Sequence, residues 1–164
     1  MSGCNRLSDF IKIGQQRLKD AEELMEKPTA DFRRSDAESR HLRGAMYLAG
    51  YAVECLLKAY LIDQERCVSL ADTQIKINTR CLSLGQEPVR RIATTSAGHD
   101  IYYLAGLTDI SYRHEYDPQL WGRLSAWKST WRYEVTTPQR EEAERFLQDV
   151  HKAVNWLQPN IIGQ

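Results

Sequence analysis

Residues 41–62 read HLRGAMYLAGYAVECLLKAYLI, and this stretch decides the fold class of the chain. On a helical wheel, with about 100° between successive residues, almost every polar side chain in and just before it falls on one stripe about 80° wide. This polar stripe consists of Arg40, Arg43, Tyr47, Tyr51, Glu54 and Lys58. The rest of the circumference is apolar, which predicts the central helix of a helical protein, with only the polar stripe in contact with water.

The apolar run Gly44–Ile62 is also long enough to raise the question of a membrane span. Two charged residues, Glu54 and Lys58, lie inside it, and further arginines precede it on the same face. Charges in these positions favour a buried helix of a soluble protein. The first residues, MSGCNRLSDFIKIG, contain no secretory apolar core. We therefore expect a cytoplasmic protein that does not contact a membrane.

Composition sets further bounds on function. The 164 residues predict one domain spanning 1–164. The net charge is zero, so no global basic field attracts nucleic acid, and any binding of RNA must use a local patch. The cysteines, Cys4, Cys55, Cys67 and Cys81, show no spacing typical of a zinc site. We expect free thiols, and neither a metal nor a cofactor.

Helical periodicity and capping residues divide the chain into further elements. Long helices are expected over about 9–27 with Ser8 as cap, over about 35–66, and over about 138–157 with Thr137 as cap. Shorter helices are expected over about 70–84, 101–107 and 118–128. The run 90–98 is expected to begin as a helical piece and continue as a flexible loop, within a less regular segment at about 68–98. No strand pattern is visible, so the prediction is an all-α, up-down bundle of four to five helices.

Three motifs occur in this order: AMYLAGYAVECLLKA at 45–59, HDIYYL at 99–104, and WRY at 131–133 ahead of the last amphipathic helix. Together they resemble the HEPN family, the helical domains named for higher eukaryote and prokaryote nucleotide binding. The first is similar to the second helix of the family, including its Glu–Lys pair. The resemblance implies a HEPN-like bundle of four to five helices that is often a homodimer.

The resemblance also implies one of two functions. Members of one branch are RNA-cleaving toxins or defence nucleases that need no metal, and their signature is an Arg followed after four to six residues by a His. Members of the other branch lack that signature. They act as helical partners of a small nucleotidyltransferase or as nucleotide-binding modules.

Arg132 occupies the position of the family's arginine. The positions that would supply the histidine hold Thr137, Pro138 and Gln139, none of which exchanges a proton near neutral pH. This departure favours the non-catalytic branch. If the chain is nevertheless a nuclease, its catalytic candidates are Arg132 together with His99 or His114.

Two other Arg–His pairs fit the signature by spacing alone. Arg145 and His151 lie on the last helix with their side chains about 120° apart, which disfavours joint binding of one phosphate. Arg34 and His41 straddle the start of the second helix, away from the family's motif. Arg34 and His41 could converge there, although a chain with 15 arginines and four histidines is also expected to contain such a spacing by chance.

The polar stripe has two interpretations. Glu54 and Lys58 are spaced i, i+4 with the acid first, which favours an ion pair that keeps one side of the central helix wet. Alternatively, the stripe lines a groove or a dimer contact. Its members are then nucleotide- or phosphate-binding candidates, and they are Arg40, Arg43, Tyr47, Tyr51, Glu54 and Lys58.

Arg90 and Arg91, followed by a loop of small polar residues up to Gly98, form a second candidate phosphate site or merely a solvated loop. His99 either caps the helix that follows it or forms a hydrogen bond within the fold. The four tryptophans are expected in the core or an interface more than on a base-stacking surface.

The sequence therefore predicts a HEPN-like domain without catalytic activity. We expect a homodimer that is the partner of a minimal nucleotidyltransferase, or a nucleotide- or nucleic-acid-associated module, in a toxin–antitoxin or defence system. A metal-independent RNase toxin and a plain protein-interaction domain are the alternatives.

Overall fold

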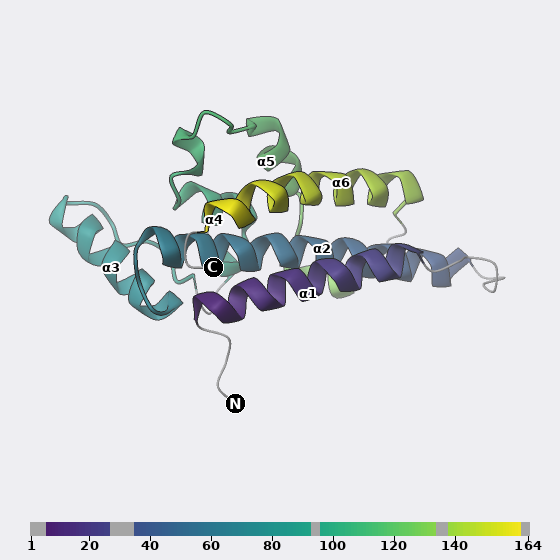
Figure 1. The fold of residues 1–164 in the computed structure, drawn as a ribbon, viewed down its shortest axis with the longest axis horizontal. Coiled ribbons are helices and arrows are strands. Elements are labelled where there is room, and N and C mark those ends of the chain that lie inside the picture. Colours follow the sequence, from purple (N-terminus) through teal and green to yellow (C-terminus); the bar gives the residue numbers. More distant parts are fainter. Residues whose placement is uncertain (1–5, 27–34, 93–95, 134–137, 162–164) are drawn as a thin grey trace.

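The computed structural model describes residues 6–26, 35–92, 96–133 and 138–161, and for residues 35–40, 96, 97 and 132 it describes the backbone alone. Three long helices form the body of the protein: α1 (Leu7–Glu26), α2 (Ser35–Gln64) and α6 (Arg140–Leu157). The α2 helix packs against both others, antiparallel to α1 and parallel to α6 (Figure 1). The described residues contain six α-helices and no strand, so the all-α prediction is confirmed.

The α2 helix is the centre of the core, as its apolar circumference predicts. Between Ala52 and Ile62 every side chain is buried, apolar and charged alike. Within the described chain, His41–Gln64 is the single segment long and apolar enough to cross a membrane, and 83% of its best window is buried inside the protein. Its apolar surface is therefore covered by the other helices of the bundle.

A close contact between Gly50 and Trp127 packs the segment that follows α5 against α2. A Cβ atom built on Gly50 would lie 2.0 Å from Cδ1 of the Trp127 indole, so only glycine leaves room for the ring. The indole Nε1 donates a hydrogen bond of 3.1 Å to the carbonyl oxygen of Tyr47. Because Trp127 is 3% exposed, the ring is fixed by both packing and hydrogen bonding.

Short elements connect α2 to α6. They are α3 (Leu70–Ser83), η2 (Ser96–His99), α4 (Ile101–Gly106), η3 (Ile110–Tyr112), α5 (Pro118–Leu124) and η4 (Ser129–Tyr133), and η5 (Gln158–Asn160) follows α6. Side-chain caps start the three α-helices: Ser69 accepts from the backbone of Asp72, Asp100 from that of Tyr103, and Asp117 from those of Gln119 and Leu120. The expected helices at 70–84 and 101–107 are thus present.

Several predicted boundaries are wrong, each for a local reason. The α1 helix starts at Leu7 because the Asp9 carboxylate accepts a hydrogen bond from the backbone of Arg6, so Ser8 is not its cap. The α2 helix stops at Gln64 because Arg66 adopts a left-handed φ of 52° and Cys67 N–H bonds back to the Ile62 carbonyl.

The remaining differences concern the later helices. The α5 helix ends at Leu124, four residues earlier than expected, and α6 begins at Arg140, so Pro138 precedes the helix. Thr137 lies outside the described residues. Residues 90–92 are not helical, because the backbone N–H groups of Val89 and Ile92 bond to the side chains of Asn78 and Gln74 on α3.

A bidentate ion pair between Arg123 and Asp149 joins α5 to α6. Arg123 Nε lies 2.6 Å from Asp149 Oδ2, and Arg123 Nη2 lies 2.9 Å from Asp149 Oδ1. The Asp149 side chain is 11% exposed. The hydrogen bonds from Arg123 hold the pKa of Asp149 below its ordinary value.

This pair gives the stability of the protein a defined pH dependence. Because the pKa of Asp149 is lower in the folded state, the pair stabilises the fold above about pH 4, and this contribution is lost as the pH falls through the lowered pKa. We expect Asp149→Asn to lower the urea midpoint at neutral pH and to have a progressively smaller effect under acidic conditions. An equal change for exposed Glu87→Gln, or a pH-independent loss for Asp149→Asn, would contradict this assignment.

Candidate functional site

The polar stripe of α2 divides into an inner and an outer half. The inner half of the stripe, Glu54 and Lys58, forms with His99 of η2 a cluster of three charged or titratable side chains, which we call the Glu54 cluster. Lys58 Nζ donates to Glu54 Oε1 at 2.6 Å, and His99 Nδ1 lies 3.0 Å from Glu54 Oε2. Both carboxylate oxygens of Glu54 are therefore used within the fold.

The Glu54 cluster is buried at one end and open at the other. The side chains of Glu54 and Lys58 are 1% and 7% exposed, whereas that of His99 is 46% exposed. The prediction that the stripe keeps one side of α2 wet is wrong for these residues. Other elements cover this part of α2: His99 of η2 reaches Glu54, and the Phe10 ring of α1 lies 5.8 Å from Lys58 Nζ.

The position of His99 depends on the turn before it. A Cβ atom on Gly98 would lie 2.1 Å from the carbonyl oxygen of Ile92, so glycine at this position lets η2 fold against the preceding segment. Asp100 then caps α4 immediately after His99. These two features position the backbone on both sides of His99, and its 3.0 Å contact with Glu54 confirms the prediction that His99 forms a hydrogen bond within the fold.

The Glu54 cluster resembles the acid–imidazole part of a proton-transfer site. A carboxylate only accepts hydrogen bonds, so the hydrogen of the contact is carried by Nδ1, and Nε2 of His99 is left for another partner. This orientation is the one by which a carboxylate prepares an imidazole to exchange protons. Lys58, in contrast, is paired and buried, so its charge does not face solvent.

The outer half of the stripe is half-buried and aromatic. The Tyr47 ring stacks with those of Tyr51 and Trp127, at centroid distances of 6.3 and 6.1 Å. The Arg43 guanidinium lies 4.9 Å from the centre of the Trp131 ring. The backbone of Arg40 continues the same helix, but its side chain lies outside the described residues.

The second candidate phosphate site is arranged differently from a phosphate-binding loop. The Arg90 guanidinium stacks on the Tyr103 ring at 4.2 Å, and the backbone N–H of Arg90 donates to the Tyr103 hydroxyl. Arg91 is exposed beside it. Residues 93–95 of the loop lie outside the described residues, as does Arg34.

The nuclease candidates lie on three different segments of the chain. His99 belongs to the Glu54 cluster, and His114 is exposed in the connector between η3 and α5. Arg132 lies in η4, where the side chain is not described. His151 faces Glu22 of α1, with 3.3 Å between Nε2 and Oε1, and Arg145 on the same helix is exposed. Among the described residues, no group of three or more His, Cys, Asp or Glu side chains could hold a metal ion.

A further surface lies on α3, which extends beyond one end of the bundle (Figure 1). Leu70, Thr73 and Ile77 are its buried side chains. Its opposite face exposes Ile75 and Leu82, at 65% and 61%, and Val68 and Leu84 flank it at 72% and 66%. We call these four residues the α3 surface. Large apolar side chains exposed together are typical of an interaction site.

Sequence reasoning missed two of these features. The contact of His99 with Glu54 joins residues 45 positions apart, and no local pattern indicates it. The α3 surface has a usable signal, because Val68, Ile75 and Leu82 recur every seven residues. That spacing places Ile75 and Leu82 on one helix face, although it does not show which face is covered.

Comparison with known protein families, with curated proteins and with solved structures finds no match for this chain. Its function therefore has to be argued from the Glu54 cluster, the outer half of the stripe and the α3 surface.

Proposed function

We propose that this chain is a non-catalytic, HEPN-like binding module that forms a homodimer through the α3 surface. In this proposal the dimer is the cytoplasmic partner of a minimal nucleotidyltransferase in a toxin–antitoxin or defence system. A nucleotide or RNA is bound on the outer half of the stripe, where Arg43 supplies a cation and Tyr47 and Tyr51 supply aromatic rings.

The observation that carries the proposal is the exposure of the α3 surface. Side-chain bonds to neighbouring segments hold α3 in place while Ile75 and Leu82 stay exposed. Two amide side chains of α3 bond to the 89–92 segment, and Arg80 binds both carboxylate oxygens of buried Glu65 at 3.1 and 2.9 Å. Burying Ile75 and Leu82 against a second copy would remove the largest exposed apolar side chains of this helix from water.

Light scattering of the purified protein tests the proposal. We expect a dimer at tens of micromolar and a monomer for Ile75→Glu/Leu82→Glu, because the added charges are unpaired in the buried contact. The matched control, Gln148→Glu/Asn155→Glu, also places two acids seven residues apart, on exposed positions of α6, and should remain dimeric.

Two outcomes would contradict the proposal. A wild-type monomer would remove the homodimer. A dimer that survives both substitutions on α3, with a circular dichroism spectrum unchanged from the wild type, would place the interface elsewhere.

The Glu54 cluster favours a second candidate function, a metal-independent RNase. Here Glu54 would orient His99 as the proton-transfer group, and Arg132 would stabilise the charged phosphate. This alternative predicts cleavage of RNA in the presence of EDTA, abolished by His99→Ala. A plain interaction domain, the third alternative, would dimerise without affinity for nucleotides, and a thermal shift assay with nucleotide distinguishes it because a ligand of the folded state raises the melting temperature.

A further inference from the structure

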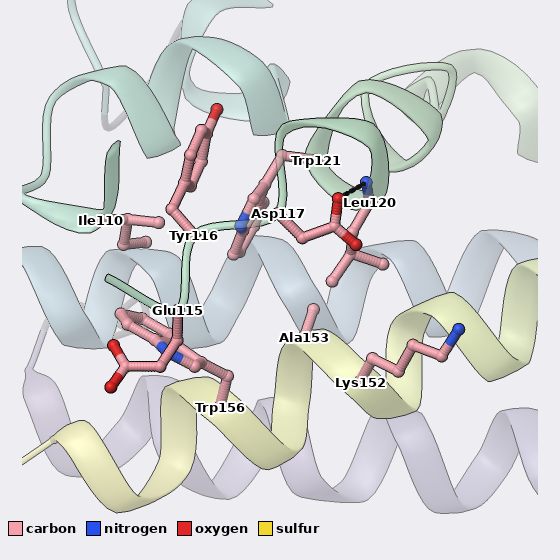
Figure 2. Close-up of a pocket in the computed structure, with 9 residues that line it drawn as sticks. All are labelled: Ile110, Glu115, Tyr116, Asp117, Leu120, Trp121, Lys152, Ala153 and Trp156. Atoms are coloured by element: carbon pink, nitrogen blue, oxygen red, sulfur yellow. Dashed lines mark hydrogen bonds between the residues drawn. The ribbon is translucent and has the colours of Figure 1, made fainter. Parts of the chain in front are cut away.

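A pocket of about 210 Å³ lies between the η3–α5 connector, α5 and α6 (Figure 2), and none of the residues that line it belongs to the α2 stripe or the α3 surface. Its lining combines aromatic rings, aliphatic side chains and acids. The lining residues are Ile110, Glu115, Tyr116, Asp117, Leu120, Trp121, Lys152, Ala153 and Trp156.

The aromatic walls are held by their neighbours. Trp121 is 3% exposed. The Trp156 ring packs at a tilt against Tyr60, with 5.8 Å between the ring centres. The Tyr60 hydroxyl in turn donates to Asp109 at 2.6 Å, and burial, followed by this hydrogen bond, raises the pKa of Tyr60 to about 12. The pocket is therefore backed by a fixed aromatic pair.

Two carboxylates lie at the edge of the pocket. Asp117 is fixed in place by capping α5, with its Oδ1 accepting from Gln119 and Leu120 at 2.9 and 3.1 Å. Glu115 is exposed, and Figure 2 shows its carboxylate beside the Trp156 ring. Within the described residues Glu115 forms no hydrogen bond or ion pair, so its charge is available to a ligand.

The single cation of the lining does not neutralise these acids. Lys152 Nζ lies 3.7 Å from Asp149 Oδ1, and Figure 2 shows its ammonium group turned away from the aromatic rings. The acids beside the rings therefore disfavour a phosphate or another anion in this pocket.

Aromatic faces combined with carboxylates are the chemistry that binds an organic cation. The negative face of each ring attracts a diffuse positive charge, and alkyl groups on the cation gain from leaving water. A bare metal ion fits poorly, because a metal site needs several converging oxygen or nitrogen ligands and the described residues provide no such group. The volume also falls below that of a pocket for a drug-sized ligand.

We propose that the pocket lined by Tyr116, Trp121 and Trp156 binds a small alkylated ammonium ion, with Glu115 and Asp117 balancing its charge. This site is separate from the surfaces of the proposed function, and its test is independent of dimerisation and of RNA.

The probe is choline, and its control is 3,3-dimethylbutan-1-ol, a neutral molecule of nearly the same shape. Titration of the full chain, followed by the indole N–H resonances of its four tryptophans, should shift those of Trp121 and Trp156 and leave those of Trp127 and Trp131 in place. We expect the neutral analogue to bind about tenfold more weakly, because it lacks the cation–π attraction.

Substitution of a lining acid tests whether its charge contributes to the binding of choline. Glu115→Gln changes one exposed side chain and should weaken choline binding several-fold while leaving binding of the neutral analogue unchanged. Glu87→Gln, which removes the same charge from an exposed position after α3, should have no effect. Three results would overturn the proposal: no resonance shift at millimolar choline, equal binding of the neutral analogue, or equal losses for the two Glu→Gln variants.

Discussion

Gly50→Ala is expected to destabilise the protein by about 3 kcal/mol or more, the upper range for overpacking a core. The new Cβ would lie 2.0 Å from Cδ1 and 2.3 Å from Nε1 of the Trp127 indole, well inside contact distance. The ring is buried and its N–H is bonded to the Tyr47 carbonyl, so it cannot shift without losing its packing or this hydrogen bond. Relief of the overlap requires moving the 118–133 segment away from α2.

Gly44→Ala is the matched control, because it makes the same change six residues earlier in the same helix. Its Cβ would meet only Leu24 Cδ1, at 3.6 Å, an ordinary contact. Alanine in a helix interior is favoured over glycine by up to about 1 kcal/mol, so this variant should be as stable as the wild type or more stable. Urea unfolding measures both variants. A Gly50→Ala protein with an unchanged midpoint would contradict the packing of Trp127 on α2.

Glu54→Leu is expected to have an effect of similar size, for an electrostatic reason. It leaves the Lys58 ammonium, 7% exposed, without its carboxylate, and it removes the acceptor of His99. Removing one member of a buried ion pair destabilises proteins by about 3–5 kcal/mol, because an uncompensated charge stays out of water. Lys58→Met should be destabilising for the same reason, since it leaves Glu54 buried.

The double variant Glu54→Leu/Lys58→Met distinguishes pairing from simple loss of volume. Replacing both charges by apolar side chains of similar size leaves no buried charge, so the double variant should recover most of the stability lost in either single variant. The double-mutant cycle is measured by urea unfolding. Additive losses in the double variant would mean that the two residues do not act as a pair.

The limits of sequence reasoning are clearest on α2. Its length and apolar circumference follow from helical periodicity, which depends only on neighbouring residues. The Glu54–Lys58 pair follows from i, i+4 spacing and is present. Its burial does not follow, because it depends on η2 and α1, whose placement is set by contacts such as Gly98 against Ile92.

Helix ends show the same contrast between features that neighbouring residues determine and features that distant contacts determine. Asp100, and not His99, caps α4, and local sequence can indicate such a residue because a cap acts within three residues. The end of α2 at Gln64 and the extended 89–92 segment were not predicted, since one depends on a left-handed residue and the other on amide side chains of another helix. The aromatic pocket likewise gathers residues from 110 to 156, which no window of sequence joins.

We propose that this chain acts by binding rather than by cutting RNA. This proposal is tested by incubating the purified protein with RNA in EDTA, together with the variants His99→Ala and Arg132→Ala for comparison. We expect intact RNA for all three proteins. Cleavage by the wild type that is lost in either variant would contradict this proposal, and loss in His99→Ala would assign the Glu54 cluster a catalytic role.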